Sequence, residues 1–250
     1  FMQKYHPMGS LAPRDVVARS IDHELKISGE EFVYLDITHK DPKEVMSHFP
    51  NIYKKCLSIG IDLTKDMIPV VPAAHYCCGG IKVNLNGESS IRRLYALGEA
   101  SSTGLHGGNR LASNSMMEAA VYADAAARHA ISVIDSIELQ RDIPAWDYEG
   151  TAVPEEMALI TQDYKEMQQI MTNYVGIVRS DVRLERAKRR LEIIFKETEE
   201  LYLKSTLSQH LCELRNMIAV GYLIIKQAEA RHESVGLHYS IDYPAKPVEI

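Results

Sequence analysis

The sequence lacks the features that mark secreted, membrane-spanning or nucleic-acid-binding proteins. Its 250 residues include four cysteines, too few for a disulfide scaffold, and the adjacent pair Cys77–Cys78 favours a reducing compartment. No apolar run approaches the roughly 20 residues that a membrane-spanning helix needs, and no basic start followed by an apolar stretch indicates a secretory signal. The formal net charge of −6 argues against nucleic acid or an anionic membrane as a partner. These absences predict a cytoplasmic protein.

The composition is that of a globular protein with a packed core. Hydrophobic residues make up 46% of the chain and charged residues 25%. Residues 1–74 mix helical and strand spacing. Their predicted elements are a helix over 15–25, a strand over 32–37 and a helix over 42–58 that begins with a proline. Residues 75–135 contain most of the glycine motifs and end in a predicted helix over 116–134.

Residues 155–233 have no glycine clusters and predict helices. Apolar residues recur there at alternating spacings of three and four, which is typical of a helix with one buried face. The two clearest series are Ile160, Tyr164, Met167, Met171 and Tyr174, and Leu207, Leu211, Leu214, Ile218 and Ile225. Gly221 takes one place in the second series, and a long charged segment separates the two. The pattern predicts a three-helix bundle.

The charged segment allows two interpretations. Four arginines recur along one predicted helical face and would suit phosphate groups. They are Arg179, Arg183, Arg186 and Arg190. Acidic residues are interleaved with them, which is typical of a solvated, ion-paired helix, and we favour that interpretation.

Two glycine-rich segments carry the residues best suited to chemistry. In the first, His75 is flanked by small residues and precedes Gly79–Gly80, so a ligand would have room beside it. In the second, a predicted strand over 94–97 ends at Gly98–Glu99, where a carboxylate can accept hydrogen bonds from a chain of hydroxyl groups. The two adjacent cysteines lack the spacing of a zinc site, so no metal is expected.

The predicted helix after these segments begins with a capping-box pattern, Ser115–Glu118. The amino end of a helix carries free N–H groups and a partial positive charge, which suits an anionic ligand or a reduced, negatively charged ring. Arg110 lies just before it in a glycine-rich loop, and a guanidinium is the natural partner of a carboxylate. For His106 in the same loop, and for Arg14 before the first helix, structural and functional roles both stay open.

These segments resemble the L-aspartate oxidases, a branch of the flavoprotein family that includes succinate dehydrogenase and fumarate reductase. The matching blocks are LAPRDVVAR (11–19), IDLT (61–64), VPAAHYCCGG (71–80) and LYALGEASSTGLHGGNRLASNSMME (94–118). The resemblance continues through YVGIVR (174–179), residues 214–216 and the tail 236–244, so it covers essentially the whole chain. Cys78 stands where the dehydrogenases usually have methionine, which favours the oxidase branch.

The resemblance implies an FAD-dependent oxidation of L-aspartate to iminoaspartate, the first step of bacterial NAD synthesis. Oxygen, giving hydrogen peroxide, or fumarate would be the electron acceptor. By position, Arg14 matches the arginine that transfers a proton at the substrate, and His75 and Arg110 match residues that bind the substrate carboxylates. The positions that match FAD contacts are Glu99, Ser115 and Met116.

One motif of the family is missing from these residues. No Gly-x-Gly-x-x-Gly loop, which would seat the FAD pyrophosphate at a helix end, occurs in residues 1–250. We therefore expect the carboxy-terminal portion of such an enzyme, α+β in class, which by itself is inactive and binds FAD weakly or not at all. Its expected parts are the end of the cap domain (1–74), the closing segment of the FAD-binding α/β domain with a linker (75–153), and an all-α three-helix bundle with its tail (154–250).

Two other functions stay open at this point. The chain has the features of a fumarate reductase or succinate dehydrogenase flavoprotein subunit, which aspartate-dependent peroxide production would distinguish from an oxidase. Alternatively, the bundle is a non-catalytic interaction module that binds another subunit or quinolinate synthase. Binding of such a partner by residues 155–250 alone would support the second alternative.

Overall fold

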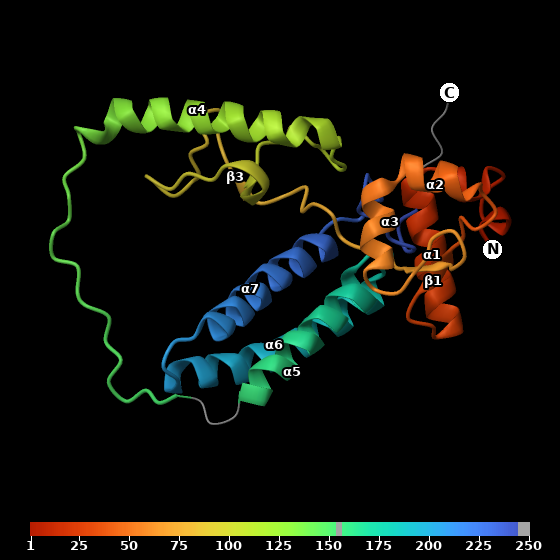
Figure 1. The fold of residues 1–250 in the computed structure, drawn as a ribbon. Coiled ribbons are helices and arrows are strands. Elements are labelled where there is room, and N and C mark those ends of the chain that lie inside the picture. The colour runs from red at the N-terminus through yellow and green to blue at the C-terminus, as the bar shows by residue number, and fades with distance from the viewer. Residues whose placement is uncertain (154–156, 245–250) are drawn as a thin grey trace. The chain divides into compact units, whose positions relative to one another are not determined.

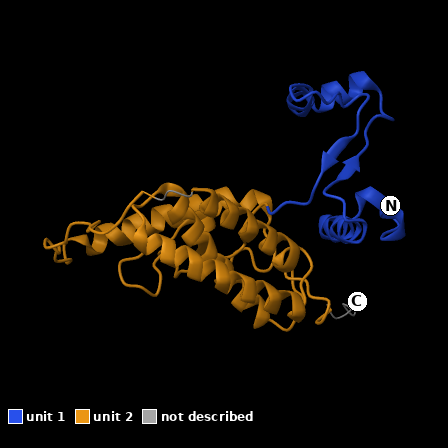
Figure 2. Ribbon diagram, turned by 90° about the horizontal axis from the view of Figure 1, so that it is seen from below, with its two compact units in different colours: residues 1–74 blue, residues 75–250 orange. Residues whose placement is uncertain are grey.

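The computed structural model describes residues 1–153 and 157–244, which fall into two compact units, Phe1–Ala74 and His75–Ile250 (Figure 2). Helices and very small sheets make up both units. The α+β class predicted from the sequence is confirmed at this level. The predicted start of the third domain, Pro154, lies outside the described residues.

The first unit contains short helices and a two-stranded sheet. Its elements are η1 (Met2–Lys4), η2 (Gly9–Leu11), α1 (Arg14–Ser28), β1 (Val33–Leu35), α2 (Pro42–His48), α3 (Pro50–Leu57) and β2 (Ile68–Val70). β1 and β2 pair antiparallel, with Val33 opposite Val70. α1 ends at Gly29, whose φ of 75° is the left-handed conformation that glycine supplies at helix ends.

Two predictions for this unit were wrong in extent. The helix expected over 42–58 is two helices, α2 and α3, because Pro50 has no N–H group and disfavours helical backbone at Phe49. The strand expected over 32–37 ends at Leu35. There the carboxylate of Asp36 accepts a hydrogen bond from the Thr38 N–H at 2.9 Å and turns the chain.

The second unit begins with the glycine-rich segments, which surround a small parallel sheet. Its elements are β3 (Ile81–Lys82), η3 (Gly98–Ala100), β4 (Ser101–Ser102), η4 (Ala112–Asn114) and α4 (Ser115–Ile134). The strand predicted over 94–97 is wrong, because Tyr95 forms only an isolated bridge with Glu88. Gly98, with φ of 61°, instead turns the backbone into η3. The helix predicted over 116–134 is confirmed as α4.

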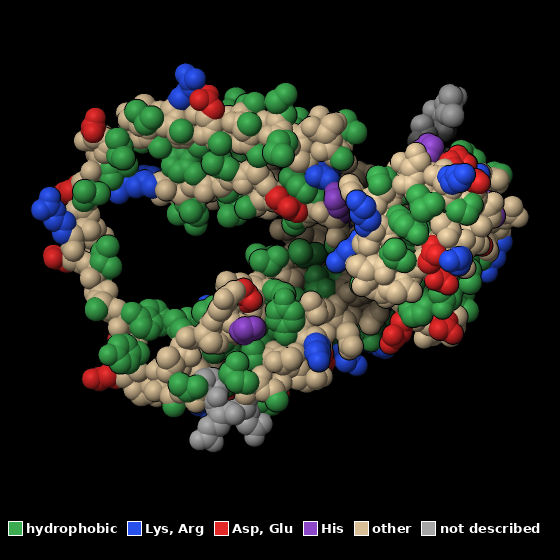
Figure 3. Space-filling view, viewed as in Figure 1, with side chains coloured by type: hydrophobic (Ala, Val, Ile, Leu, Met, Phe, Trp, Pro, Cys, Tyr) green, Lys and Arg blue, Asp and Glu red, His purple; other side chains and the backbone are tan. Residues whose placement is uncertain are grey.

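α4 packs only a small part of its surface within the described residues. Glu118 and Ala126 are its buried residues, whereas Met116, Met117 and Val121 are exposed. In the space-filling view, hydrophobic side chains cover much of the visible face of α4 (Figure 3). The amino end of this helix is therefore accessible.

The second unit also contains the predicted helical bundle (Figure 1). Its elements are α5 (Met157–Ile170), η5 (Met171–Val175), α6 (Asp181–Lys204) and α7 (Gln209–Glu229). Their apolar faces meet in one core, which includes Ile160, Met167, Leu184, Leu191, Ile194, Leu211, Leu214, Ile218 and Ile225. The hydroxyl groups of Ser180 and Ser208 cap α6 and α7 by accepting hydrogen bonds from first-turn N–H groups.

Gly221 lies in this core at the place predicted for an apolar side chain. A Cβ at this position would come within 2.3 Å of the Met167 Cε atom. The methionine of α5 therefore occupies the space that a larger residue on α7 would need.

The arginines of the charged segment make contacts within the bundle, and the guanidinium carbons of Arg186 and Arg190 lie 6.0 and 5.9 Å from the centre of the Tyr174 ring. Arg190 lies 3.8 Å from the Glu166 carboxylate, and Arg183 donates to the Val178 carbonyl at 2.9 Å. Arg179 precedes α6 and is half-buried. The structure thus favours ion pairing and packing over a phosphate-binding face.

Within residues 1–153 and 157–244, no helix is long and apolar enough to cross a membrane. The same residues contain no group of three or more His, Cys, Asp or Glu side chains that could hold a metal ion.

Candidate functional site

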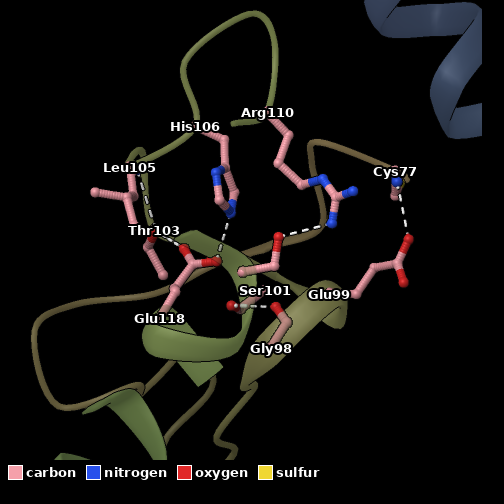
Figure 4. A network of polar contacts seen from close by, with 10 residues as sticks. Cys77, Gly98, Glu99, Ser101, Thr103, Leu105, His106, Arg110 and Glu118 are labelled. Atoms are coloured by element: carbon pink, nitrogen blue, oxygen red, sulfur yellow. Dashed lines mark hydrogen bonds and ion pairs between the residues drawn. The ribbon is translucent and has the colours of Figure 1, made fainter. Parts of the chain in front are cut away.

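The glycine-rich segments after His75 and after Leu97 lie side by side in the second unit. β3 and β4 pair in parallel, and Gly80 packs so closely on the other segment that a Cβ would meet the Ala100 oxygen at 2.3 Å. The Glu99 carboxylate also accepts a hydrogen bond from the Cys77 N–H at 2.9 Å (Figure 4). The loop that carries His75 is thus tied to the segment that carries Glu99.

The predicted capping box at Ser115–Glu118 was wrong. α4 starts at Ser115 with Asn114 as its N-cap, and no side chain there accepts a hydrogen bond from the first turn. The Ser115 hydroxyl instead accepts a hydrogen bond from Arg110 at 2.7 Å. Glu118 is turned toward the preceding loop, because two donors of that loop reach its carboxylate.

Glu118 is the centre of a buried polar network (Figure 4). Its carboxylate accepts hydrogen bonds from the Thr103 hydroxyl and from the His106 Nε2 atom, the latter at 2.7 Å. Only 2% of the Glu118 side chain and 9% of the His106 side chain are exposed. A buried carboxylate with such donors fixes the loop between them, since losing either bond would leave a polar group unpaired.

His106 has one further property that bears on its role. Its Nδ1 atom is buried and has no hydrogen-bond partner among the described residues. With Nε2 bonded to a carboxylate, the neutral ring carries its proton on Nε2, which leaves Nδ1 as an acceptor. The bond from Nε2 to the buried Glu118 carboxylate supports a structural role for His106.

Arg110 is held by two contacts in the same network. One N–H donates to Ser115, and the guanidinium carbon lies 4.1 Å from the centre of the Tyr76 ring. Tyr76 in turn meets the His106 ring edge to face, with centroids 5.6 Å apart. An arginine fixed on an aromatic face keeps its other N–H groups for a carboxylate.

The structure brings some of the predicted site residues together and leaves others apart. Arg110 and Ser115 are in direct contact, whereas Glu99 is joined to the residue two places beyond His75. Met116, 83% exposed, stands next to Ser115 on the first turn of α4. His75 itself is exposed.

Arg14 belongs to the first unit. It is the first residue of α1, and its guanidinium donates to the carbonyl groups of Ser10 and Ala12 at 2.8 and 2.9 Å. The side chain is exposed and folds back over η2. Its predicted role at the substrate stays a prediction.

Sequence reasoning missed the partners that hold the site. Tyr76, Thr103 and the carboxylate role of Glu118 were not identified, although all three are within the motif blocks. The available signal for Tyr76 was its position directly after His75, a candidate substrate-binding residue. A contact between Gly108 and the tail, described below, had no local signal in the sequence.

Two family models match the chain. The model described as "FAD binding domain" matches residues 1–116, and the one described as "Fumarate reductase flavoprotein C-term" matches residues 164–247. The solved Mycobacterium smegmatis Sdh1 in complex with UQ1 is 28% identical with a TM-score of 0.78, over 98% of this chain and 43% of that one. A quinol-fumarate reductase with menaquinol molecules is 26% identical with a TM-score of 0.78, over 100% of this chain and 49% of that one. The chain belongs to the succinate dehydrogenase and fumarate reductase flavoprotein family.

Within that family, the similar curated relatives carry the name L-aspartate oxidase. The Yersinia pestis protein is 49% identical over 98% of this chain, and the Pseudomonas aeruginosa protein is 46% identical over 98%. The chain covers 46% and 45% of these relatives, so it spans about half of their length. The resemblance found in the sequence is confirmed.

Proposed function

We propose that these residues belong to an FAD-dependent L-aspartate oxidase, which converts L-aspartate to iminoaspartate as the first step of NAD biosynthesis. The observation that carries the proposal is Arg110, fixed on Tyr76 and Ser115 at the accessible amino end of α4. In this proposal residues 1–74 end the cap domain, 75–153 close the FAD-binding domain, and 154–250 form the bundle and tail. Oxygen, giving hydrogen peroxide, or fumarate takes the electrons.

Binding of a dicarboxylate needs cationic or hydrogen-bonding groups for both carboxylates. Arg110 provides a planar fork whose orientation is set by the Tyr76 ring and the Ser115 hydroxyl. His75, exposed on the loop tied to Glu99, provides a second donor. Arg14, by its match to the family motif, would move a proton at the amino-bearing carbon of aspartate. Fixed clamps on both carboxylates hold that carbon in one place, which is the main demand of the reaction on the protein.

The accessible end of α4 fits a flavin. Because Ser115 is engaged by Arg110 and Asn114 makes no side-chain cap bond, the first-turn N–H groups of α4 remain for an anionic ligand. Met116 is exposed beside them, and Glu99 binds Cys77 through one oxygen, so its other oxygen can accept a hydrogen bond from a hydroxyl group. FAD, when bound, supplies the two-electron acceptor for the oxidation.

The proposal is tested by the activity of the whole protein with its flavin. L-aspartate should drive hydrogen peroxide formation, and succinate should not be oxidised. Arg14→Leu should abolish turnover with unchanged flavin absorbance, since Arg14 is exposed and contacts only nearby carbonyl groups. Arg128→Leu, an exposed arginine on α4, is the matched control and should keep its activity.

The same assay decides the principal alternative. Succinate oxidation or fumarate reduction without aspartate oxidation would assign the chain to the respiratory flavoproteins, which its similarity to Sdh1 also allows. Retained aspartate oxidation in Arg14→Leu would remove Arg14 from its assigned role. Quinolinate synthase as a partner, and a cytoplasmic location, stay predictions.

A further inference from the structure

A short hairpin after α7 contacts the loop that carries Arg110. Val235 and His238 exchange backbone hydrogen bonds of 2.9 and 3.1 Å, and Gly236, with φ of 58°, forms the turn between them. The N–H group of Leu237 then donates to the Gly108 carbonyl at 2.9 Å. The bond joins the segment after α7 to the Gly104–Arg110 loop.

The two backbones meet without side chains between them. A Cβ on Gly236 would lie 2.1 Å from the Gly108 oxygen, and a Cβ on Gly108 would lie 3.2 Å from a Val235 methyl group. Distances this short leave no room for any other residue at Gly236, because the obstacle is backbone. The hairpin and the loop are therefore in specific contact.

The hairpin is fixed to the helical bundle through Arg179. The half-buried Arg179 guanidinium donates to the His238 Nδ1 atom at 2.6 Å and to the Val175 carbonyl at 2.8 Å. The backbone of Arg179 also pairs with the tail, through bonds of 3.0 Å to Tyr239 and from Ile241. A hairpin held by side chain and backbone together cannot move without the bundle.

The tail beyond the hairpin is also held. The Asp242 carboxylate accepts from the Asp181 N–H at 2.7 Å, and the Tyr243 hydroxyl donates to the Asp181 carboxylate at 2.7 Å. Both bonds lie at the amino end of α6, where a negative side chain such as Asp242 is favoured. The segment from Val235 to Tyr243 is thus anchored along its length.

The loop itself has few other supports. His106 is held by Glu118, and Arg110 by Tyr76 and Ser115, whereas Gly107 and Asn109 are exposed. Gly108 lies between these two held residues, so the hairpin supports the loop at its middle. Movement of Gly108 would change the direction in which Arg110 leaves the backbone.

We propose that the Val235–His238 hairpin, anchored on the bundle by Arg179, is a positioning element for substrate binding by the Gly104–Arg110 loop. The inference rests on the proposed function, in which Arg110 binds a carboxylate of aspartate. Gly236 acts by close contact with Gly108, and His238 acts by holding the hairpin on Arg179. The helical bundle thereby contributes to the substrate site without touching the substrate.

The first test is Gly236→Ala in the whole flavin-loaded protein. The added Cβ displaces Gly108, so the KM for L-aspartate should rise about fivefold or more while kcat stays within about twofold, as expected for lost uniform binding. Amide hydrogen exchange of a peptide spanning 104–110 should accelerate, with exchange in α6 and α7 unchanged. Gly60→Ala is the matched control, because Gly60 has a φ of +87° and nothing within 4 Å of a Cβ.

A second pair of variants tests the anchor and does not depend on the folding of Gly236→Ala. His238→Leu removes the acceptor for Arg179, whereas His238→Asn keeps an acceptor oxygen near the position of Nδ1. His238→Leu should reproduce the KM increase and the faster loop exchange, and His238→Asn should restore both in part.

Amide hydrogen exchange of the 104–110 peptide tests the hairpin contact independently of the proposed function. If the wild type does not oxidise aspartate but loop exchange rises in Gly236→Ala and His238→Leu, the proposed function fails and the contact stands. If both variants fold with wild-type loop exchange and wild-type KM, the hairpin does not position the loop.

Discussion

At the scale of single residues, the site depends on Tyr76 as the platform for Arg110. The guanidinium lies 4.1 Å from the centre of the ring. A cation over an aromatic face contributes roughly 0.5–2 kcal/mol, so Tyr76→Leu should raise the KM for L-aspartate by about 2- to 30-fold. Tyr76→Phe keeps the ring and should behave nearly as the wild type in the same steady-state assay.

Tyr148→Leu is the matched control, because it makes the same substitution at a tyrosine that is 70% exposed and should leave the KM unchanged. An unchanged KM in Tyr76→Leu, with flavin bound, would show that Ser115 alone orients the arginine.

Glu118 holds the preceding loop through two buried hydrogen bonds. Its carboxylate accepts from Thr103 and His106, so Glu118→Gln places an NH₂ group or a weaker acceptor opposite a buried donor. Leaving one buried partner unsatisfied costs about 1–3 kcal/mol. We expect a free energy of unfolding lower by that amount in urea titrations followed by circular dichroism.

Asp124→Asn on the same helix is the matched control for Glu118→Gln. Asp124 is 64% exposed in an i,i+4 pair with Arg128, and solvent screens an exposed pair of this kind so that its loss should leave stability nearly unchanged. Equal effects of the two substitutions would mean that the network around Glu118 contributes nothing to stability.

At the scale of elements, the sequence predicted the helices and strands that depend on local patterns and missed those that depend on distant contacts. The bundle helices were found because burial repeats along each helix, and Ile160, Leu214 and Ile218 are all buried as that spacing requires. The capping box at Ser115 failed because its two side chains bind Arg110 and His106, which no local pattern shows. The strand over 94–97 failed because an apolar run needs a partner strand, and only Tyr95 has a bridge.

Gly221 allows a test of the bundle core at this scale. Its missing side chain leaves room for Met167, so Gly221→Leu must displace a side chain of which only 3% is exposed. Overpacking of a well-filled core costs about 1–3 kcal/mol, and the melting temperature should fall accordingly. Ala219→Leu adds the same side chain at an exposed position of α7 and should leave the melting temperature nearly unchanged. A core that accepts Gly221→Leu without loss would show that α5 and α7 are loosely packed.

At the scale of the whole molecule, the site draws on segments far apart in the sequence. The sequence alone predicted site roles for His75, Arg110, Glu99 and Ser115 through the family resemblance, and comparison with relatives confirms the family. It could not show that Gly108 contacts the tail, because a contact between glycines leaves no periodicity or charge pattern. A contact of this kind, between segments far apart in the sequence, becomes visible only in the folded chain.

The hydrogen bond between Arg179 and His238 makes the stability of the second unit depend on pH. Burial and the neighbouring Arg179 cation lower the pKa of His238 below its ordinary value of 6.5. Arg231 acts in the same direction, whereas the Arg231 carbonyl, which pairs with Nε2, and Glu233 oppose it. At neutral pH His238 is therefore uncharged in the folded state, and its Nδ1 atom accepts from Arg179.

The sign of the pH effect follows from proton uptake. Between pH 6.5 and the lower pKa of the folded state, the unfolded chain binds more protons at His238, so stability falls as the pH falls. Above pH 6.5 the contribution is complete. We expect the melting temperature to drop between pH 7.5 and 5.0, and His238→Asn to reduce that drop because asparagine does not titrate. His210→Asn, at an exposed position of α7, should keep the wild-type drop, and a His238→Asn protein with the same drop would show that the pH effect arises at other groups.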